Sequence, residues 1–230
     1  MRLLISIKDL DEAREVMAAG GVDILDVKNP AEGTLGANVP WVIEAVKGLV
    51  GGKMELAASI GDLEYKPGTA SLAAYGVARM GIDYITASMF AVKTKEQVID
   101  MASKLYKTLE DFDCGLIISG YADWERIGCA NPFEYVGELG DADIMMLDTA
   151  IKDGTNILDF ATLDELAEYR DTAHEHGMKV VIAGSIRYPQ LFLAAGLKPD
   201  FLGFRGIVCE NAEVKREKVA MLKEELSKLC

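Results

Sequence analysis

The chain has 230 residues, half of them hydrophobic, and carries 24 basic against 37 acidic side chains, a formal net charge of −13. This length suits one large or two small domains with a sizeable core. The acidic balance excludes a polyanion-binding surface, because affinity for nucleic acid comes mainly from clustered Lys and Arg. No segment approaches the roughly 18 apolar residues of a membrane helix, and the N-terminus becomes charged too early for a signal peptide. We therefore expect a cytoplasmic protein that binds neither nucleic acid nor membrane.

The four cysteines show no CxxC spacing, and the only two histidines are His174 and His176. Zinc cages in proteins are built from closely spaced Cys and His pairs. We therefore expect no metal site in this chain.

Short apolar segments rich in β-forming residues recur along the chain. They predict strands over residues 3–7, 23–27, 54–59, 83–88, 115–119, 143–147, 179–183 and 201–204. Segments with helical periodicity separate them, as over 9–19 and 95–109, and a last helix is expected over 214–229. Asp9, Thr94 and Thr162 have the position and chemistry of helix N-caps.

Alternating strands and helices, with nearly continuous apolar strands, indicate a parallel sheet covered by helices. Eight repeats of about 29 residues favour a closed (β/α)₈ barrel, a single domain over residues 1–230. The alternative is an open, doubly wound sheet of six or seven strands. Its dinucleotide-binding version lacks the expected GxGxxG motif after the first strand.

In a (β/α)₈ barrel the catalytic groups follow the C-terminal ends of the strands. Asp26 lies at the end of the second predicted strand and Lys28 directly follows it, and the period-two geometry points both to the same side. Burial at the barrel mouth lowers the pKa of a lysine and makes its amine able to form a Schiff base with a carbonyl. We interpret Lys28 as that amine and Asp26 as its acid–base partner; the alternative is a structural ion pair at the rim.

Asp148 and Lys152 repeat this combination after the sixth predicted strand. We expect the two Asp/Lys pairs to meet at the barrel mouth, with solvent-exposed loop charges as the alternative.

Gly184 and Ser185 follow the seventh predicted strand, and Arg205 and Gly206 follow the eighth. Barrels of this kind build phosphate sites there from loop amides, a hydroxyl and a cation, so we expect a phosphorylated substrate. The alternative is a capping glycine and a rim arginine. Lys66, in the turn-rich segment 61–69, is a further candidate for substrate binding, or else a solvated loop lysine.

Several motifs together resemble the (5-formylfuran-3-yl)methyl phosphate synthase family of methanogens over the whole chain. They are residues 26–30, 32–38, 65–69, 120–123, 147–154 and 183–186. The resemblance implies a (β/α)₈ barrel enzyme of methanofuran biosynthesis. Such an enzyme condenses two glyceraldehyde 3-phosphate molecules, with loss of phosphate and water, without a metal or organic cofactor, and is generally a homo-oligomer. It also implies that Lys28 forms the Schiff base and that Asp26, Asp148 and Lys152 are the supporting groups.

One position departs from the family pattern: its fourth strand normally ends with a proton-transferring lysine where this chain has Thr86. A threonine cannot replace an ammonium group in acid–base work at neutral pH. Either Lys93, Lys66 or Lys152 supplies the proton, or the chain is a paralogue. Such a paralogue would be another Schiff-base aldolase or isomerase for a small phosphorylated aldehyde, or a non-catalytic barrel that binds a phosphorylated ligand.

Overall fold

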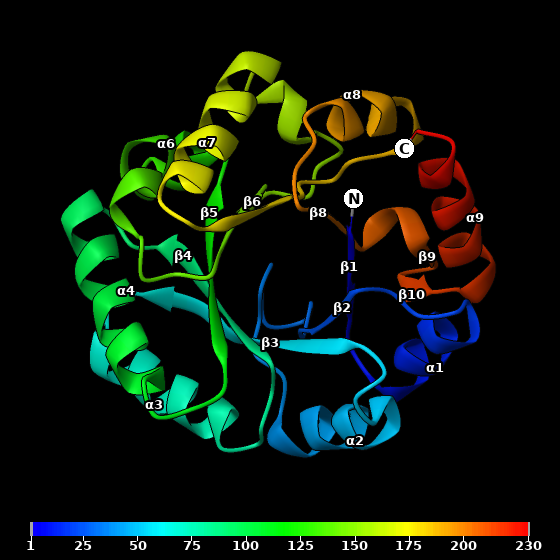
Figure 1. The fold of residues 1–230 in the computed structure, drawn as a ribbon, viewed down its shortest axis with the longest axis horizontal. Coiled ribbons are helices and arrows are strands. Elements are labelled where there is room, and N and C mark those ends of the chain that lie inside the picture. The colour runs from blue at the N-terminus through cyan, green and yellow to red at the C-terminus, as the bar shows by residue number, and fades with distance from the viewer. Residues whose placement is uncertain (1, 230) are drawn as a thin grey trace.

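Eight parallel strands form a closed barrel in the computed structural model, which describes residues 2–229. They are β1 (Arg2–Ile7), β2 (Ile24–Val27), β3 (Glu55–Glu64), β4 (Tyr84–Ala91), β5 (Gly115–Tyr121), β6 (Ile144–Asp148), β7 (Lys179–Ile182) and β8 (Phe201–Phe204). Their order around the barrel follows the chain, and β8 pairs with β1, Leu202 opposite Leu3, to close it (Figure 1). The predicted (β/α)₈ barrel is thus confirmed, and the open sheet is excluded.

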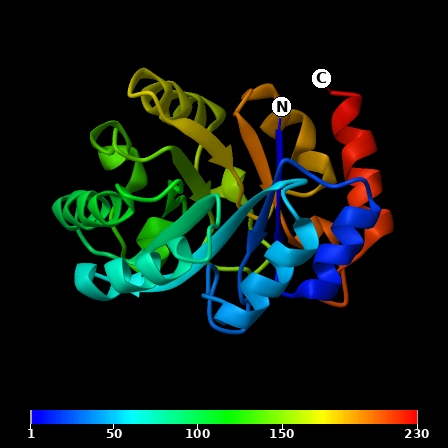
Figure 2. The same ribbon diagram turned by 60° about the horizontal axis from the view of Figure 1, so that its bottom comes forward.

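Helices surround the barrel, and the last one, α9, packs beside the first, α1 (Figures 1 and 2). They are α1 (Leu10–Ala18), α2 (Pro40–Val50), α3 (Pro67–Ala78), α4 (Lys95–Leu109), α5 (Trp124–Ile127), α6 (Pro132–Tyr135), α7 (Leu163–Glu175), α8 (Leu191–Gly196) and α9 (Arg216–Ser227). A short hairpin of β9 (Cys209–Glu210) and β10 (Glu213–Val214) precedes α9. No helix within residues 2–229 is both long and apolar enough to cross a membrane.

Three side chains cap helices as predicted. Asp9, Thr94 and Thr162 accept the backbone N–H groups of Glu12, Gln97 and Glu165. Each cap satisfies a donor that the first turn of the helix leaves free, which explains why these helices begin where they do.

The strands β3 and β4 are longer than predicted. They stay paired beyond the barrel wall, Asp62 opposite Ser88 and Glu64 opposite Ala91, with irregular register between Ser59 and Glu64. The prediction of a loop over 61–69 is therefore wrong for residues 61–64. This segment is polar and contains a glycine because it is partly exposed to solvent at the barrel rim. Its backbone nevertheless stays extended, because it pairs with β4.

An aspartate directly before each even-numbered strand fastens the N-terminal end of the barrel. Its carboxylate accepts the backbone N–H of a residue on the preceding strand. The contacts are Asp23 with Leu3 (2.7 Å), Asp83 with Leu56 (2.8 Å), Asp143 with Leu116 (2.7 Å) and Asp200 with Val180 (2.8 Å). These charge-assisted bonds lie at the end of the barrel where residues serve stability rather than chemistry.

The barrel interior changes from apolar to polar toward its C-terminal end. A small hydrophobic cluster, which includes Leu4, Ile24 and Phe201, fills the interior toward the N-terminal end of the barrel. Two residues further along β1 and β2, and so on the same inward side, Ser6 and Asp26 are buried polar groups. The larger core cluster lies between the barrel and the helices. The polar layer marks the end of the barrel at which a site is possible.

Candidate active site

A cavity of about 740 Å³ opens at the C-terminal end of the barrel, lined by the ends of β1, β2, β6, β7 and β8 and the loops that follow them. Five of its lining side chains are cationic: Lys8, Lys28, Lys152, Arg187 and Arg205. A strongly acidic protein thus concentrates positive charge in one pocket. Such a pocket suits a small anionic ligand.

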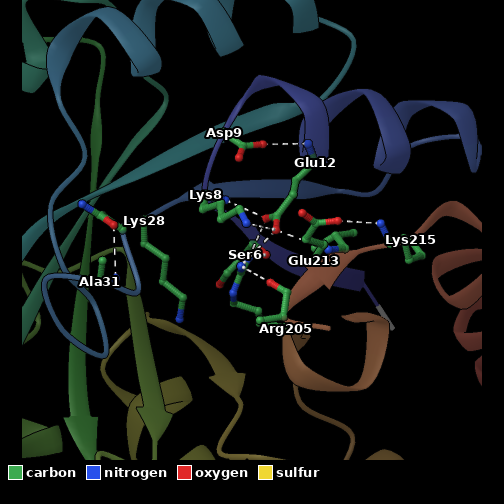
Figure 3. Close-up of polar contacts among 12 residues, drawn as sticks. Ser6, Lys8, Asp9, Glu12, Lys28, Ala31, Arg205, Glu213 and Lys215 are labelled. Atoms are coloured by element: carbon green, nitrogen blue, oxygen red, sulfur yellow. Dashed lines mark hydrogen bonds and ion pairs between the residues drawn. The ribbon is translucent and has the colours of Figure 1, made fainter. Parts of the chain in front are cut away.

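Lys28 lies directly after β2 and is only 6% exposed. In the chain from residue 2 to 229, its Nζ has no carboxylate within 4.0 Å and no hydrogen-bond partner, and no dashed line reaches it in Figure 3. Burial lowers the pKa of Lys28, although Asp148 and Asp26 act to raise it. The arrangement offers an unpaired amine with an increased neutral fraction.

Asp26 is completely buried beneath Lys28. The Ser6 hydroxyl donates to one of its carboxylate oxygens at 2.9 Å, and the Thr86 hydroxyl to the other at 3.4 Å. Burial raises the pKa of Asp26, while Lys28 and these hydrogen bonds act to lower it. No Asp26–Lys28 ion pair forms among the described residues. Asp26 is therefore a buried carboxyl group suited to hold a proton near the amine.

Asp148 ends β6 and anchors the second lysine of the cavity. Lys152 Nζ lies 3.0 Å from Asp148 Oδ1 and donates to the Thr149 carbonyl oxygen at 2.6 Å. Although burial acts to raise it, the ammonium groups of Lys152 and Lys28 hold the pKa of Asp148 below its ordinary value. The structure therefore brings Asp26, Lys28, Asp148 and Lys152 together at one barrel mouth.

The loop after β7 has a special backbone. Gly184 and Ser185 have consecutive positive φ angles, 92° and 54°. A Cβ atom at Gly184 would lie 2.9 Å from the Ile157 Cβ, so only glycine fits there. Within the described chain, no partner accepts the backbone N–H of Gly184, Ser185 or Ile186. Ser185 thus has a left-handed backbone conformation that is rare for residues other than glycine, and it lies beside backbone N–H groups without partners. Both features are typical of functional loops.

Arg205 is present in the cavity wall, but most of its donors are already used. Glu12 accepts two of its N–H groups at 2.7 and 3.1 Å, and the Ser6 carbonyl oxygen accepts at 3.0 Å (Figure 3). Glu12 is itself buried and also accepts the backbone N–H of Lys8. The sequence gives no signal for the buried position of Glu12, because an acidic residue in the first turn of a helix is common at the surface.

Arg187 is the cavity arginine without an ion-pair partner among the described residues. No carboxylate lies within 4.0 Å of its guanidinium in the described part of the chain, and its side chain is exposed at the cavity rim. The sequence holds a signal for this residue, since it follows Gly184–Ser185–Ile186 in the same loop.

The structure does not bring Lys66 into the cavity. It lies between β3 and α3, 64% exposed at its side chain, and pairs with Glu64 at 2.8 Å. Lys93 is likewise exposed and outside the cavity lining. Of the three lysines considered as replacements for the missing amine at Thr86, Lys152 alone lines the cavity in residues 2–229.

Residues 3–223 match the 4-HFC-P synthase family. A relative from Methanosarcina barkeri is 43% identical over 213 residues, 91% of each chain, and one from Methanocaldococcus jannaschii is 42% identical over 233 residues, 97% of this chain and 99% of the relative. Both relatives are named (5-formylfuran-3-yl)methyl phosphate synthase.

Solved structures support the fold. The 3-hexulose-6-phosphate synthase of Salmonella typhimurium superimposes with a TM-score of 0.70, at 15% identity and full coverage of both chains. The N-(5'-phosphoribosyl)anthranilate isomerase of Pyrococcus furiosus gives 0.63, at 15% identity and 99% coverage of both. At such low identity the likeness concerns the fold alone.

Proposed function

The chain belongs to the 4-HFC-P synthase family, and from that premise we propose that it makes (5-formylfuran-3-yl)methyl phosphate for methanofuran biosynthesis. The family is named for a synthase, so the chain belongs to a family of enzymes. The proposed substrates are two molecules of glyceraldehyde 3-phosphate. Their atoms equal those of the product, one phosphate and two water molecules, so the reaction needs no oxidant or reductant.

The observation that carries the proposal is the amine of Lys28, buried and unpaired in a cationic cavity. A neutral lysine amine adds to an aldehyde carbon, and loss of the carbonyl oxygen as water leaves an imine. The protonated imine withdraws electrons from the neighbouring carbon, so that a proton is released there. The resulting carbon nucleophile forms the new bond to the aldehyde carbon of the second molecule.

The carboxyl groups and the second lysine are assigned the proton transfers. The buried Asp26, whose pKa is raised, is suited to exchange a proton with the imine nitrogen region. Asp148, whose pKa is lowered, holds Lys152, and we assign the protonation of a leaving oxygen to the ammonium group of Lys152. Because Thr86 carries no amine, Lys152 is the lysine proposed for the proton transfer that the family assigns to its fourth strand.

The phosphate groups are assigned to the loops after β7 and β8. Free amides near Ser185, the Ser185 hydroxyl and Gly206 at the start of its short helical turn support this assignment. Arg205 contributes positive charge but keeps its contacts with Glu12. Arg187 adds the free guanidinium that bidentate phosphate binding needs.

Borohydride trapping tests the proposal. The protein is incubated with glyceraldehyde 3-phosphate and sodium borohydride, and peptides are mapped by mass spectrometry. We expect one reduced triose phosphate adduct on Lys28, its absence in Lys28→Ala, and an unchanged yield in Lys53→Ala, an exposed lysine near the opposite end of the barrel. If the wild type forms no adduct, the proposed function is contradicted and the alternative of a non-catalytic barrel is favoured. An adduct without an ultraviolet-absorbing furan product indicates another Schiff-base aldolase or isomerase.

A further inference from the structure

Two aspartates, Asp62 and Asp123, hold the loops that carry Lys28 and Lys152 by accepting hydrogen bonds from their backbone N–H groups. Asp62, on β3, accepts the backbone N–H groups of Thr34 at 2.7 Å and Leu35 at 3.2 Å. In the same way Asp123, after β5, accepts the N–H groups of two consecutive residues of the other loop. They are Ala150 at 2.7 Å and Ile151 at 2.9 Å. One carboxylate therefore holds the loop that starts at Lys28, and the other holds the residues just before Lys152.

The first loop is closed at its base and packed tightly on Asp62. Asn29 N–H donates to the Gly36 carbonyl oxygen at 2.8 Å, so residues 29–36 form a compact loop next to Lys28. A Cβ atom at Gly33 would lie 2.2 Å from the Asp62 Oδ2, which means that the backbone approaches the carboxylate as closely as only glycine permits. Several residues of this loop line the cavity, including Thr34.

The two loops are joined across the barrel mouth. Thr34 Oγ1 donates to the Ala150 carbonyl oxygen at 2.9 Å, 116 residues away in sequence. Behind this contact, the Tyr121 hydroxyl donates to Asp62 Oδ1 at 3.2 Å and bonds the Ser88 hydroxyl at 2.7 Å. Because Tyr121 ends β5 two residues before Asp123, the contacts form a ring that links both aspartates and both loops.

We propose that Asp62 and Asp123 are positioning residues, which set the places of Lys28 and Lys152 relative to each other through the Thr34 bridge. This inference rests on the proposed function, because it concerns the same two amines. Neither aspartate lines the cavity; each acts through the loop it holds. A rigid loop next to Lys28 keeps this lysine buried, which acts to lower the pKa of its amine, and it places Lys152 within reach of the same ligand.

The aspartates at the opposite end of the barrel provide a matched control. Asp83 also accepts a backbone N–H through its carboxylate, at 2.8 Å, but it does so at the N-terminal end, remote from the cavity. Asp62→Asn and Asp83→Asn therefore make the same change, because each replaces a carboxylate that accepts backbone N–H by a neutral amide with a single acceptor oxygen. Only the first change lies in the ring at the site, where both oxygens of Asp62 accept hydrogen bonds.

The test measures the reactivity of Lys28 without requiring turnover. Wild type, Asp62→Asn and Asp83→Asn are labelled with trace acetic anhydride at a series of pH values, and the apparent pKa of Lys28 is obtained from labelled peptides. A loosened loop admits water, so we expect the Lys28 pKa to rise in Asp62→Asn and its labelling at neutral pH to fall by about tenfold per pH unit of rise. The loss of the Asp62 negative charge would by itself lower the pKa of Lys28. A rise of this pKa in Asp62→Asn therefore shows that the loop has loosened.

The bridge has its own pair of variants. Thr34→Val removes the hydroxyl at nearly constant volume and is expected to weaken kcat/KM by about 10–100-fold, mainly through kcat. Thr34→Ser keeps the hydroxyl and is expected to restore most of the loss. In Asp123→Asn, we expect faster hydrogen exchange at Ala150 and Ile151.

An unchanged Lys28 labelling profile in Asp62→Asn, or an equal change in Asp83→Asn, overturns the positioning role. A wild type that labels at a lowered pKa but forms no borohydride adduct contradicts the proposed function and leaves the positioning result standing. The two failures are thereby separated.

Discussion

Glu12 and Arg205 form a bidentate ion pair at the cavity wall, with oxygen–nitrogen distances of 2.7 and 3.1 Å. The Glu12 side chain is 3% exposed and that of Arg205 16%. A pair so buried joins α1 to the end of β8, where the barrel closes. It holds the arginine in the cavity wall with most of its donors already used.

Breaking this pair is expected to destabilise the protein strongly. Glu12→Gln leaves the Arg205 charge poorly compensated in a buried position, which typically costs about 3–5 kcal/mol in the free energy of unfolding. Urea denaturation measures the change. Glu217→Gln, in an exposed pair with Arg216, is the control and should cost less than about 1 kcal/mol. Similar losses in both variants would contradict the structural importance of the Glu12–Arg205 pair.

The pH dependence of imine trapping should reveal the electrostatics of Lys28. Because burial lowers the pKa of Lys28, trapping should reach its plateau at a lower pH than for an exposed lysine of ordinary pKa 10.5. Asp148 acts to raise that pKa, so Asp148→Asn removes an opposing effect and should move the inflection to still lower pH. Trapping rates from pH 6 to 10 measure both profiles. A shift of the variant to higher pH would contradict the assigned proximity.

Restoring an amine on β4 tests the departure at Thr86. Thr86→Lys places an ammonium group where the Thr86 hydroxyl now lies 3.4 Å from Asp26. We expect furan formation to rise, but by less than the about 10²–10⁴-fold that general acid–base catalysis usually contributes, because Lys152 already supplies part of this proton transfer. The product is measured by its ultraviolet absorbance. Thr86→Met, of similar length but uncharged, is the control. If Thr86→Lys folds but forms furan no faster than Thr86→Met, the missing amine at position 86 does not limit turnover.

Arg187 should contribute to substrate affinity. Loss of its free guanidinium in Arg187→Ala is expected to raise KM by about tenfold or more, because a hydrogen bond to a charged group is worth roughly 1.5–3 kcal/mol. The effect should fall on KM rather than kcat. Arg79→Ala, at an exposed position after α3, is the control. An unchanged KM would leave phosphate binding to the loop amides and Arg205.

Much of the architecture is readable in the sequence because it depends on local pattern. The apolar strands, the capping residues such as Asp9 and Thr162, and the rule that polar groups follow strand ends all act over a few residues. That rule also selects Asp26, Lys28, Asp148 and Lys152. The closed barrel brings the last three together in the cavity lining, and Asp26 is buried next to them in the barrel interior. Their chemical roles and the expected homo-oligomer stay predictions.

Tertiary structure alone decided which charges are available. Sequence pattern selected Lys66 as a candidate for substrate binding and did not select Arg187. In the structure Lys66 pairs with Glu64 outside the cavity, and Arg187 lies at the cavity rim without an ion-pair partner among the described residues. Sequence pattern also treats Asp62 as a loop residue, whereas the extension of β3 places it on the backbone of Thr34. These outcomes depend on contacts between residues far apart in sequence, and electrostatic pairing acts through space, so no local pattern determines them. The acidic composition excluded a polyanion surface, while folding gathered five cations into one small pocket.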